Sequence, residues 1–299
     1  MEITPYHPFR SAKAKEQYLQ LYDMRAKTWP VPSEARTVDT SYGHTFVRIS
    51  GPAGAPPLVL LHGSSGNSLQ WIPNIEALSG VFKTYAVDNI YDYGRSVYTR
   101  PIKSPGDFTT WLEELFSALE IGNAINLMGL SYGGWLTCLY ALRFPNRLEK
   151  IVLLAPAFTV LPLRLAWLIR AIVGFLPHRT FARNFMYWLA EDSMKKNDAC
   201  RIMIEEIADD AFMAVRCFKP KHMVYPTVLK DKVLQSISVP ALYLVGENEK
   251  LYSARKAVQR LNRVAPRIKA EIIPGAGHDL TIVQADVVNK KVLDFLKQP

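Results

Sequence analysis

The sequence predicts an α/β protein with a mostly parallel central sheet, and two observations lead to this prediction. First, apolar runs of strand length alternate along the chain with segments of helical periodicity, which favours parallel strands joined by right-handed crossovers. Second, residues 57–61 are apolar at every position, as in a strand buried on both faces of a parallel sheet. The predicted strands of this kind lie at residues 57–61, 82–87, 124–128, 150–154, 240–245 and 268–273.

The first part of the chain predicts a helix followed by a hairpin. Residues 11–29 have helical periodicity and are expected to end before Pro30, because the residue that precedes a proline disfavours helix. Residues 36–40 and 44–49 alternate between apolar and polar side chains around Ser41-Tyr42-Gly43, which is typical of a β-hairpin. The remaining helices outside residues 157–225 are expected near residues 69–78, 107–119, 135–144, 253–264 and 283–296.

The strand–helix alternation stops between residues 157 and 225. This segment contains helical patterns with many large apolar side chains and no clear strand. A helical block between two strands of one sheet predicts an inserted cap, although such an apolar stripe is also typical of ordinary core helices. The predicted organisation is therefore an N-terminal helical extension at 1–35, a core at 36–156 and 226–299, and a cap at 157–225.

Composition narrows the class of protein. The chain has 299 residues, 49% of them hydrophobic, which is enough for one large core, and its net charge is +9. Lys and Arg are spread along the chain without a long basic run, so we expect no nucleic-acid partner; a peripheral contact with a membrane surface stays open. The most apolar segment, residues 157–176, is interrupted by Pro162, Arg164 and Arg170, so no transmembrane segment is expected.

Other features point to a cytoplasmic protein without a cofactor. The N-terminus has no apolar run of the kind that a secretory signal contains. The three cysteines are odd in number and lack metal-ligand spacing, so we expect reduced thiols. No metal or cofactor motif is visible, and the sequence does not indicate an oligomeric state.

The most informative motif is Gly129-Leu130-Ser131-Tyr132-Gly133, a G-x-S-x-G pattern between a predicted strand and a predicted helix. A serine on such a tight turn is held in a strained conformation with its hydroxyl exposed, and small neighbours let strand and helix approach closely. The helix that follows directs its N-terminal N–H groups at the site, where negative charge would develop. We therefore predict Ser131 as a nucleophile; the alternative is a surface serine on a glycine-rich turn.

A serine nucleophile needs a base and a group that orients the base. His278 follows the last predicted strand in a loop with two glycines, on the edge where the nucleophile emerges, and is the predicted base. The turn after residues 240–245 offers Glu247 and Glu249 as the acid, whereas the turn after 150–154 carries no carboxylate. The chain order Ser, Glu, His is that of α/β-hydrolases rather than of the two serine protease families.

An oxyanion hole requires two preorganised donors. The Tyr132 N–H directly follows the predicted nucleophile, and the His62-Gly63-Ser64 turn after residues 57–61 can supply the second donor, for which we predict the Ser64 N–H. His62 itself is expected to brace this turn rather than to act in catalysis.

These motifs resemble those of the α/β-hydrolase fold, over about residues 37–296. The resemblance is carried by His62-Gly63-Ser64, residues 129–134, Val239-Pro240 with Gly246, and Gly277-His278. It implies an α/β-hydrolase core with a helical cap, and it favours Glu249 as the acid, three residues after Gly246. Two departures stand out. The acid is Glu rather than the usual Asp, and the loop at residues 88–96 is one residue longer than the family pattern, with Asp92 at its first glycine position.

The resemblance implies a serine hydrolase, and we predict a carboxylesterase that acts on small or medium apolar esters. Ser131 as nucleophile argues against dehalogenases and epoxide hydrolases of this fold, which use Asp. Hydrolysis of a carbon–carbon bond in a diketone-type acid uses the same triad and stays open, because Arg164, Arg170 or Arg183 could hold the substrate carboxylate. A small-molecule receptor with an idle triad also stays open, since the fold alone does not determine function.

Overall fold

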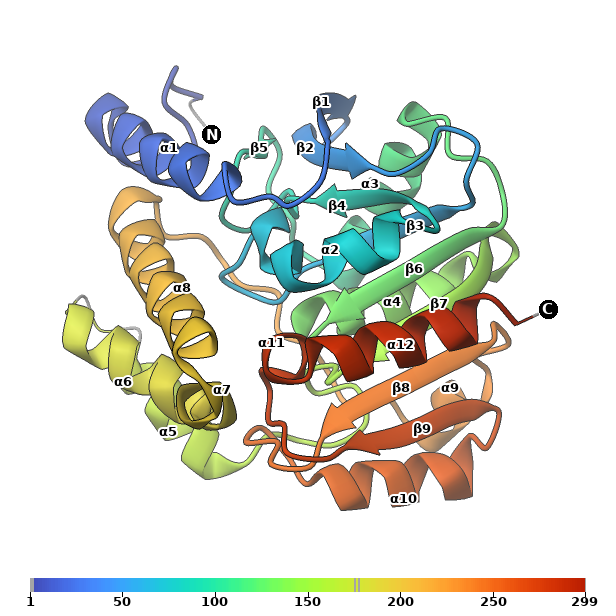
Figure 1. The fold of residues 1–299 in the computed structure, drawn as a ribbon. Helices are drawn as coiled ribbons and strands as arrows, with labels where there is room; N and C mark the ends of the chain where they lie inside the picture. The colour runs from blue at the N-terminus through green and yellow to red at the C-terminus, as the bar shows by residue number, and fades with distance from the viewer. Residues whose placement is uncertain (1–2, 175, 177, 299) are drawn as a thin grey trace.

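The computed structural model describes residues 3–174, 176 and 178–298 (Figure 1). The predicted segments 1–35, 157–225 and 226–299 therefore include a few residues (1–2, 175, 177 and 299) that lie outside this description. The strands of the described chain are β1 (Glu34–Thr40), β2 (Gly43–Ser50), β3 (Pro57–Leu61), β4 (Lys83–Val87), β5 (Val97–Tyr98), β6 (Ile125–Leu130), β7 (Leu148–Leu154), β8 (Ala241–Gly246) and β9 (Ile268–Ile273).

These strands form one sheet in the order β1-β2-β4-β3-β6-β7-β8-β9, with β5 paired to β2. Strand β2 is antiparallel to β1, β4 and β5, and all the other pairs are parallel. The predicted mostly parallel sheet is thus confirmed. Because β6, β7, β8 and β9 are adjacent and parallel, the loops that follow them emerge at the same edge of the sheet.

Helices cover both faces of the sheet. In Figure 1, α2 (Ile72–Ser79), α11 (Leu280–Val283) and α12 (Ala285–Leu296) lie in front of it, and α3 (Pro105–Ala118) and α4 (Tyr132–Arg143) lie behind. Helix α10 (Ala254–Val264) packs beside β9. Helix α3 starts at a capping box, in which the Ser104 side chain and Asp107 satisfy each other's backbone N–H groups. The predicted final helix is divided at Gln284. The short α9 (Asp231–Gln235) and β5 were not predicted, because elements of five and two residues show too little periodicity.

Four helices between β7 and β8 form what we call the helical block: α5 (Leu165–Gly174), α6 (Arg179–Leu189), α7 (Glu191–Lys196) and α8 (Asp198–Cys217). Figure 1 shows the block at the edge of the sheet toward which β6 and β8 point. The N-terminal helix α1 (Ala12–Ala26) packs against α8, and its Arg25 bonds to Asp210 at 3.3 Å. The first helix of the chain is therefore held to both the core and the block.

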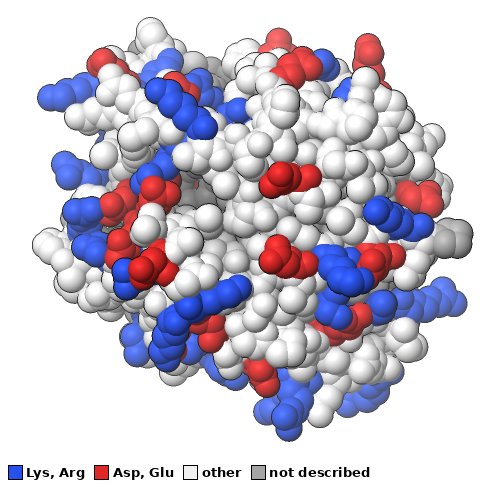
Figure 2. Space-filling model, in the orientation of Figure 1, with Lys and Arg blue, Asp and Glu red and all other residues white. Residues whose placement is uncertain are grey.

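On the face that Figure 2 shows, basic and acidic side chains are mixed. Figure 2 shows Lys and Arg side chains spread over the visible face with Asp and Glu between them. Among the described residues, no helix is both long and apolar enough to cross a membrane. The three cysteines, Cys138, Cys200 and Cys217, are free thiols.

Candidate active site

Ser131 lies on the turn between β6 and α4 in a strained backbone conformation. Its φ is 53° and its ψ is −113°, a region that L-residues rarely adopt and that marks functional turns. The turn is fixed on both sides, because the Ser131 N–H donates to Leu154 O at 2.8 Å and the Ser131 carbonyl accepts from the Ala157 N–H at 3.0 Å. The end of β7 therefore holds the serine at the carboxyl edge of the sheet, where it is half-buried.

Two glycines make this turn sterically possible. A Cβ added to Gly129 would lie 2.2 Å from the Gly133 carbonyl oxygen, and one added to Gly133 would lie 2.2 Å from the Leu61 carbonyl oxygen. Both separations are far below van der Waals contact, so α4 can pack this closely on β6 and β3 only with glycine at both positions. The glycines of the sequence motif thus have a geometric role.

Glu249 and His278 are joined directly. The His278 Nδ1 lies 2.8 Å from Glu249 Oε2, and the other carboxylate oxygen accepts the Leu251 N–H at 2.8 Å. The Glu249 side chain is fully buried, whereas 12% of the His278 side chain is exposed. Nδ1 is therefore the protonated nitrogen that donates to the carboxylate, which leaves Nε2 as the acceptor that a general base requires.

The environment tunes this histidine toward basicity. Burial by itself would lower the pKa of His278, but the charge and the hydrogen bond of Glu249, with Asp279 adding to them, raise it above the ordinary value for histidine. In the part of the chain that the structure describes, the Ser131 hydroxyl makes no hydrogen bond.

Glu247, the other candidate acid, lies elsewhere. Its side chain is exposed, and its Oε2 accepts the Gly275 N–H at 3.3 Å instead of contacting the imidazole. A Cβ added to Gly246 would lie 2.2 Å from the Gly277 carbonyl oxygen, so the acid loop and the histidine loop pack tightly at this point. Of the two glutamates, the geometry joins Glu249 to His278.

The turn that follows β3 approaches the serine. A Cβ added to Gly63 would lie 3.4 Å from Ser131 Cβ, and the Gly63 N–H is bound by Gln70 Oε1 at 2.8 Å. The next residue, Ser64, is exposed, and the N–H of Tyr132 belongs to the first residue of α4, where no intrahelical acceptor exists. The Tyr132 N–H therefore directly follows the serine, and the turn that carries the Ser64 N–H approaches it at Gly63.

His62 braces this turn, as the sequence indicated. It is fully buried; its Nε2 accepts the Asn89 N–H at 3.0 Å, so its Nδ1 is the protonated nitrogen and donates to Gly63 O at 2.7 Å. Both ring nitrogens are therefore used for structure.

Asp92 is a residue whose role the sequence did not reveal. Its two carboxylate oxygens accept the Ser65 N–H at 3.2 and 3.1 Å, and Ser65 itself has a left-handed φ of 64°. Lys221, from the segment after the helical block, places its Nζ 3.7 Å from Asp92 Oδ1. Burial lowers the pKa of Lys221, and the Asp92 charge opposes that shift. The signal in the sequence was the departure from the family pattern at Asp92, but its distant partner could not be found there.

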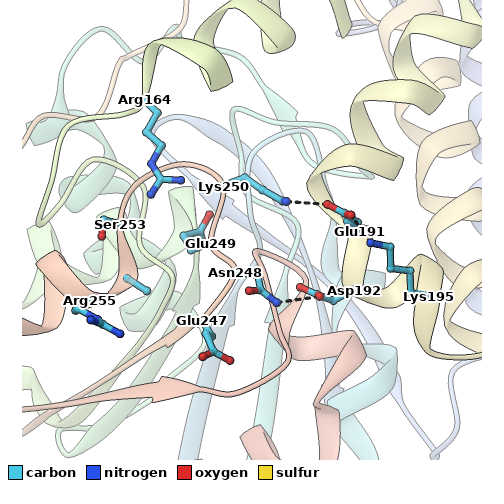
Figure 3. A pocket seen from close by; sticks show the side chains of 11 residues that line it. Arg164, Glu191, Asp192, Lys195, Glu247, Asn248, Glu249, Lys250, Ser253 and Arg255 are labelled. Carbon is cyan, nitrogen blue, oxygen red and sulfur yellow. Dashed lines mark hydrogen bonds and ion pairs between the residues drawn. The ribbon is translucent and has the colours of Figure 1, made fainter.

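The helical block contacts both loops of the Glu249–His278 pair, and Figure 3 shows its contacts with the acid loop. Asn248 Nδ2 donates to Asp192 Oδ1 at 3.0 Å, and Lys250 Nζ donates to Glu191 Oε2 at 2.8 Å. In the histidine loop, Asp279 accepts the Ser193 N–H at 2.9 Å. Residues on either side of the acid, and the one after the histidine, are thus bound to α7. None of these contacts could be read from the sequence.

A polar cavity of about 500 Å³ lies between α7, the acid loop and the start of α10. Figure 3 shows charged side chains around it, among them Arg164 and Glu247, and neither Ser131 nor His278 lines it. Of the other arginines considered for a substrate carboxylate, Arg170 stacks on Trp188 at 4.8 Å and Arg183 bonds to the Tyr187 hydroxyl. None of the three is placed beside the serine by a contact in the structure.

The described residues contain no group of three His, Cys, Asp or Glu side chains that could hold a metal ion. What the site does contain is a strained serine at the N-terminus of α4 and a histidine whose Nδ1 bonds to a buried carboxylate, which leaves its Nε2 free. These parts are suited to nucleophilic attack on a carbonyl carbon.

The fold and this site define an α/β hydrolase, and the chain belongs to the alpha/beta hydrolase family, whose model matches residues 58–291. It is 35% identical, over 96% of both proteins, to Carboxylesterase YbfK of Bacillus subtilis (strain 168). The crystal structure of that carboxylesterase matches with a TM-score of 0.86 at 33% identity, covering 96% of this chain and 99% of the other.

Two further structures place the chain within the fold. The naproxen esterase of Bacillus subtilis matches with a TM-score of 0.87 at 32% identity, covering 96% of this chain and all of the other. A meta-cleavage product hydrolase (CumD) matches with a TM-score of 0.70 at 21% identity, covering 88% of this chain and 98% of the other, which shows a shared fold only. The family resemblance seen in the sequence is confirmed.

Proposed function

We propose that the protein is a carboxylesterase that cleaves small or medium apolar esters through an acyl-enzyme intermediate. The observation that supports this most is the 2.8 Å bond between a buried Glu249 and His278 at the sheet edge where Ser131 is held in a left-handed conformation. The similarity over nearly the whole chain to carboxylesterases of Bacillus subtilis supports the same reaction.

In the proposed mechanism, Ser131 Oγ attacks the ester carbonyl carbon while His278 Nε2 takes the hydroxyl proton. Glu249 holds the imidazole in the required tautomer and stabilises the imidazolium that forms. The N–H groups of Ser64 and Tyr132 would stabilise the oxyanion, helped by the N-terminus of α4. His278 then gives its proton to the leaving alkoxide, and water attacks the acyl-enzyme by the same steps to release the acid.

The helical block is our proposed cap, with the cap segment at 157–225, the core at 36–156 and 226–299, and the extension at 1–35. Large apolar side chains of the block, such as Trp167, Leu189 and Met213, pack against the core, which supports a cap that closes over apolar substrates. We also propose that the protein acts in the cytoplasm, on a small-molecule ester and without a cofactor.

An assay with p-nitrophenyl esters, the matching anilides and diketone-type acids, using wild type and Ser131→Ala side by side, tests this function. We expect multiple turnovers on esters by the wild type and at least about a 10⁵-fold loss in the variant, because removal of a triad nucleophile leaves only binding and the oxyanion hole. A fluorophosphonate probe should label Ser131 alone.

Other outcomes would redirect the assignment. Faster turnover of the diketone acid than of any ester would indicate a carbon–carbon hydrolase. A single turnover, or none on activated esters, would indicate a receptor. Full activity in a folded Ser131→Ala protein would exclude Ser131 as the nucleophile.

A further inference from the structure

Helix α5 exposes a continuous apolar face. Leu165, Ile169 and Ile172 are 70%, 55% and 63% exposed, although each carries a large aliphatic side chain. Their spacing of four and then three residues places them on one side of a helix. Leu168 and Val173 share this face and its exposure. A contiguous patch of this kind on a single helix marks an interaction site, whereas isolated exposed apolar residues do not.

The opposite side of α5 already has its partners. Ala171 and Gly174 are buried, and Trp167 packs against the core. A Cβ added to Gly174 would lie 2.6 Å from Phe185 Cβ, so α5 and α6 are in close contact there. The helix is therefore fixed by its inner side, and folding of the chain leaves the outer face to solvent. In Figure 1, α5 lies at the lower edge of the helical block.

The charged residues of the chain segment that carries this face are all basic. Between Glu149 and Glu191 the chain contains no acidic residue, while it contains Arg164, Arg170 and two further arginines on α6. The two on α6 are engaged, Arg179 with Asp209 of α8 and Arg183 with the Tyr187 hydroxyl, within 4.0 Å of Glu205.

Arg164 and Arg170 form no ion pair within the described residues, although Arg164 shares a cavity lining with Glu191, Asp192 and Glu247. Arg164 precedes the first residue of α5, and Arg170 lies at the border of the apolar face, stacked on Trp188. Both are exposed.

We propose that the outer face of α5 docks the protein on the surface of an anionic phospholipid bilayer. A short helix with one apolar face and arginines at its borders fits the plane of the headgroup region, where aliphatic side chains enter the acyl boundary and guanidinium groups meet phosphates. A second copy of the chain fits this face less well than a bilayer does. A two-fold contact through α5 would bring the unpaired Arg164 and Arg170 of both copies together. Docking here would place the helical block at the membrane, where apolar esters concentrate.

Sedimentation with lipid vesicles tests the proposal without any use of catalysis. The samples are the wild-type protein and the variants Ile172→Glu on α5 and Val287→Glu on α12, mixed with vesicles of phosphatidylcholine alone or of phosphatidylcholine and phosphatidylglycerol in equal amounts. Val287 is a matched control, because it is an exposed β-branched residue on a helix of the core. Hydrolysis of p-nitrophenyl acetate, measured in parallel, reports separately on the proposed catalytic function.

We expect the wild type and Val287→Glu to bind the anionic vesicles at low salt and to be released in 0.5 M NaCl, since part of the attraction is electrostatic. Ile172→Glu should bind at least about tenfold more weakly, because its carboxylate would enter the apolar boundary. Failure of the wild type to bind, or equal binding by Ile172→Glu, would overturn the proposal. So would a wild-type dimer in light scattering that Ile172→Glu abolishes while neither protein binds vesicles.

Discussion

The two sides of the candidate active site are fixed by different parts of the chain. On the oxyanion side, the turn at residues 63–65 is held by His62 and by the Asp92 carboxylate, whose ion pair with Lys221 is mostly buried, with 11% and 20% of the side chains exposed. On the acid–histidine side, the flanks of Glu249 are bound to α7 through more exposed polar contacts, such as Lys250 with Glu191, at 23% and 40%.

This difference has a consequence for motion. Interactions between exposed charges are weak and screened by salt, whereas a buried pair is costly to break because it leaves an uncompensated charge. A displacement of the helical block would therefore disturb the loop of Glu249 before it disturbed the oxyanion turn.

Of the substitutions that compare the two sides, the one at the acid is expected to have the largest effect. Glu249→Gln should lower kcat on p-nitrophenyl esters by at least about 10²-fold with little change in KM, because the amide no longer stabilises the imidazolium or fixes the tautomer. Glu247→Gln is the matched control and should stay within a few-fold of wild type, since that side chain contacts Gly275 instead of the imidazole. The reverse ranking would transfer the acid role to Glu247, and two unaffected variants would contradict the triad.

The pH dependence should shift with the same substitution. His278 acts as a base only when neutral, so kcat/KM of the wild type should rise with pH through an apparent pKa above the ordinary histidine value of about 6.5. Because the Glu249 charge raises that pKa, Glu249→Gln should move the ascending limb to lower pH while the plateau falls. The profile is measured with an uncharged ester between pH 5 and 9. A limb that stays in place would mean that a group other than His278 titrates.

These two predictions concern residues that the sequence could identify, and the reason is local. Ser131, Glu249 and His278 lie in the loops that follow β6, β8 and β9, and these parallel strands bring their ends to one edge of the sheet. Pattern and order along the chain are therefore enough to predict them. The choice between the two glutamates was harder, because both follow Gly246. In the sequence only the family resemblance favoured Glu249; in the structure Glu249 is buried and bonded to His278.

The contacts that hold the loops of the site could not be predicted, because they join residues that are far apart in the sequence. Asp92 and Lys221 are 129 positions apart, and the contacts of α7 with Asn248 and Lys250 depend on how the helical block is placed on the core. Such pairings leave no periodic or local signal. At Asp92 the departure from the family pattern marked the loop as unusual, but it did not indicate that the carboxylate would bind the Ser65 N–H.

A smaller effect is expected on the oxyanion side. Asp92→Asn should lower kcat about tenfold, roughly 1.4 kcal/mol, because the turn that carries the Ser64 N–H loses a charged acceptor while the donor itself remains. The double variant Asp92→Asn/Lys221→Met removes the charge left without a partner. It should recover thermal stability but not kcat, which separates positioning from folding. Equal recovery of both quantities would indicate that Asp92 acts on stability only.

The smallest effect is expected at the contact between the acid loop and α7. Lys250 and Lys195 both bind Glu191, but only Lys250 is next to Glu249, and 71% of the Lys195 side chain is exposed. Lys250→Met should therefore lower kcat/KM by a few-fold, in line with the 0–1 kcal/mol or so of a partly exposed pair, and 0.5 M NaCl should produce a similar loss in the wild type. Lys195→Met removes the same charge from the same carboxylate and should leave kcat/KM unchanged.

An equal loss of kcat/KM in the two variants would mean that the loss follows from the changed charge around Glu191 and not from the contact between Lys250 and the acid loop. A loss of more than about 30-fold in Lys250→Met would mean that the block holds the acid loop as firmly as the buried pair holds the oxyanion turn, and the proposed contrast between the two sides would be wrong.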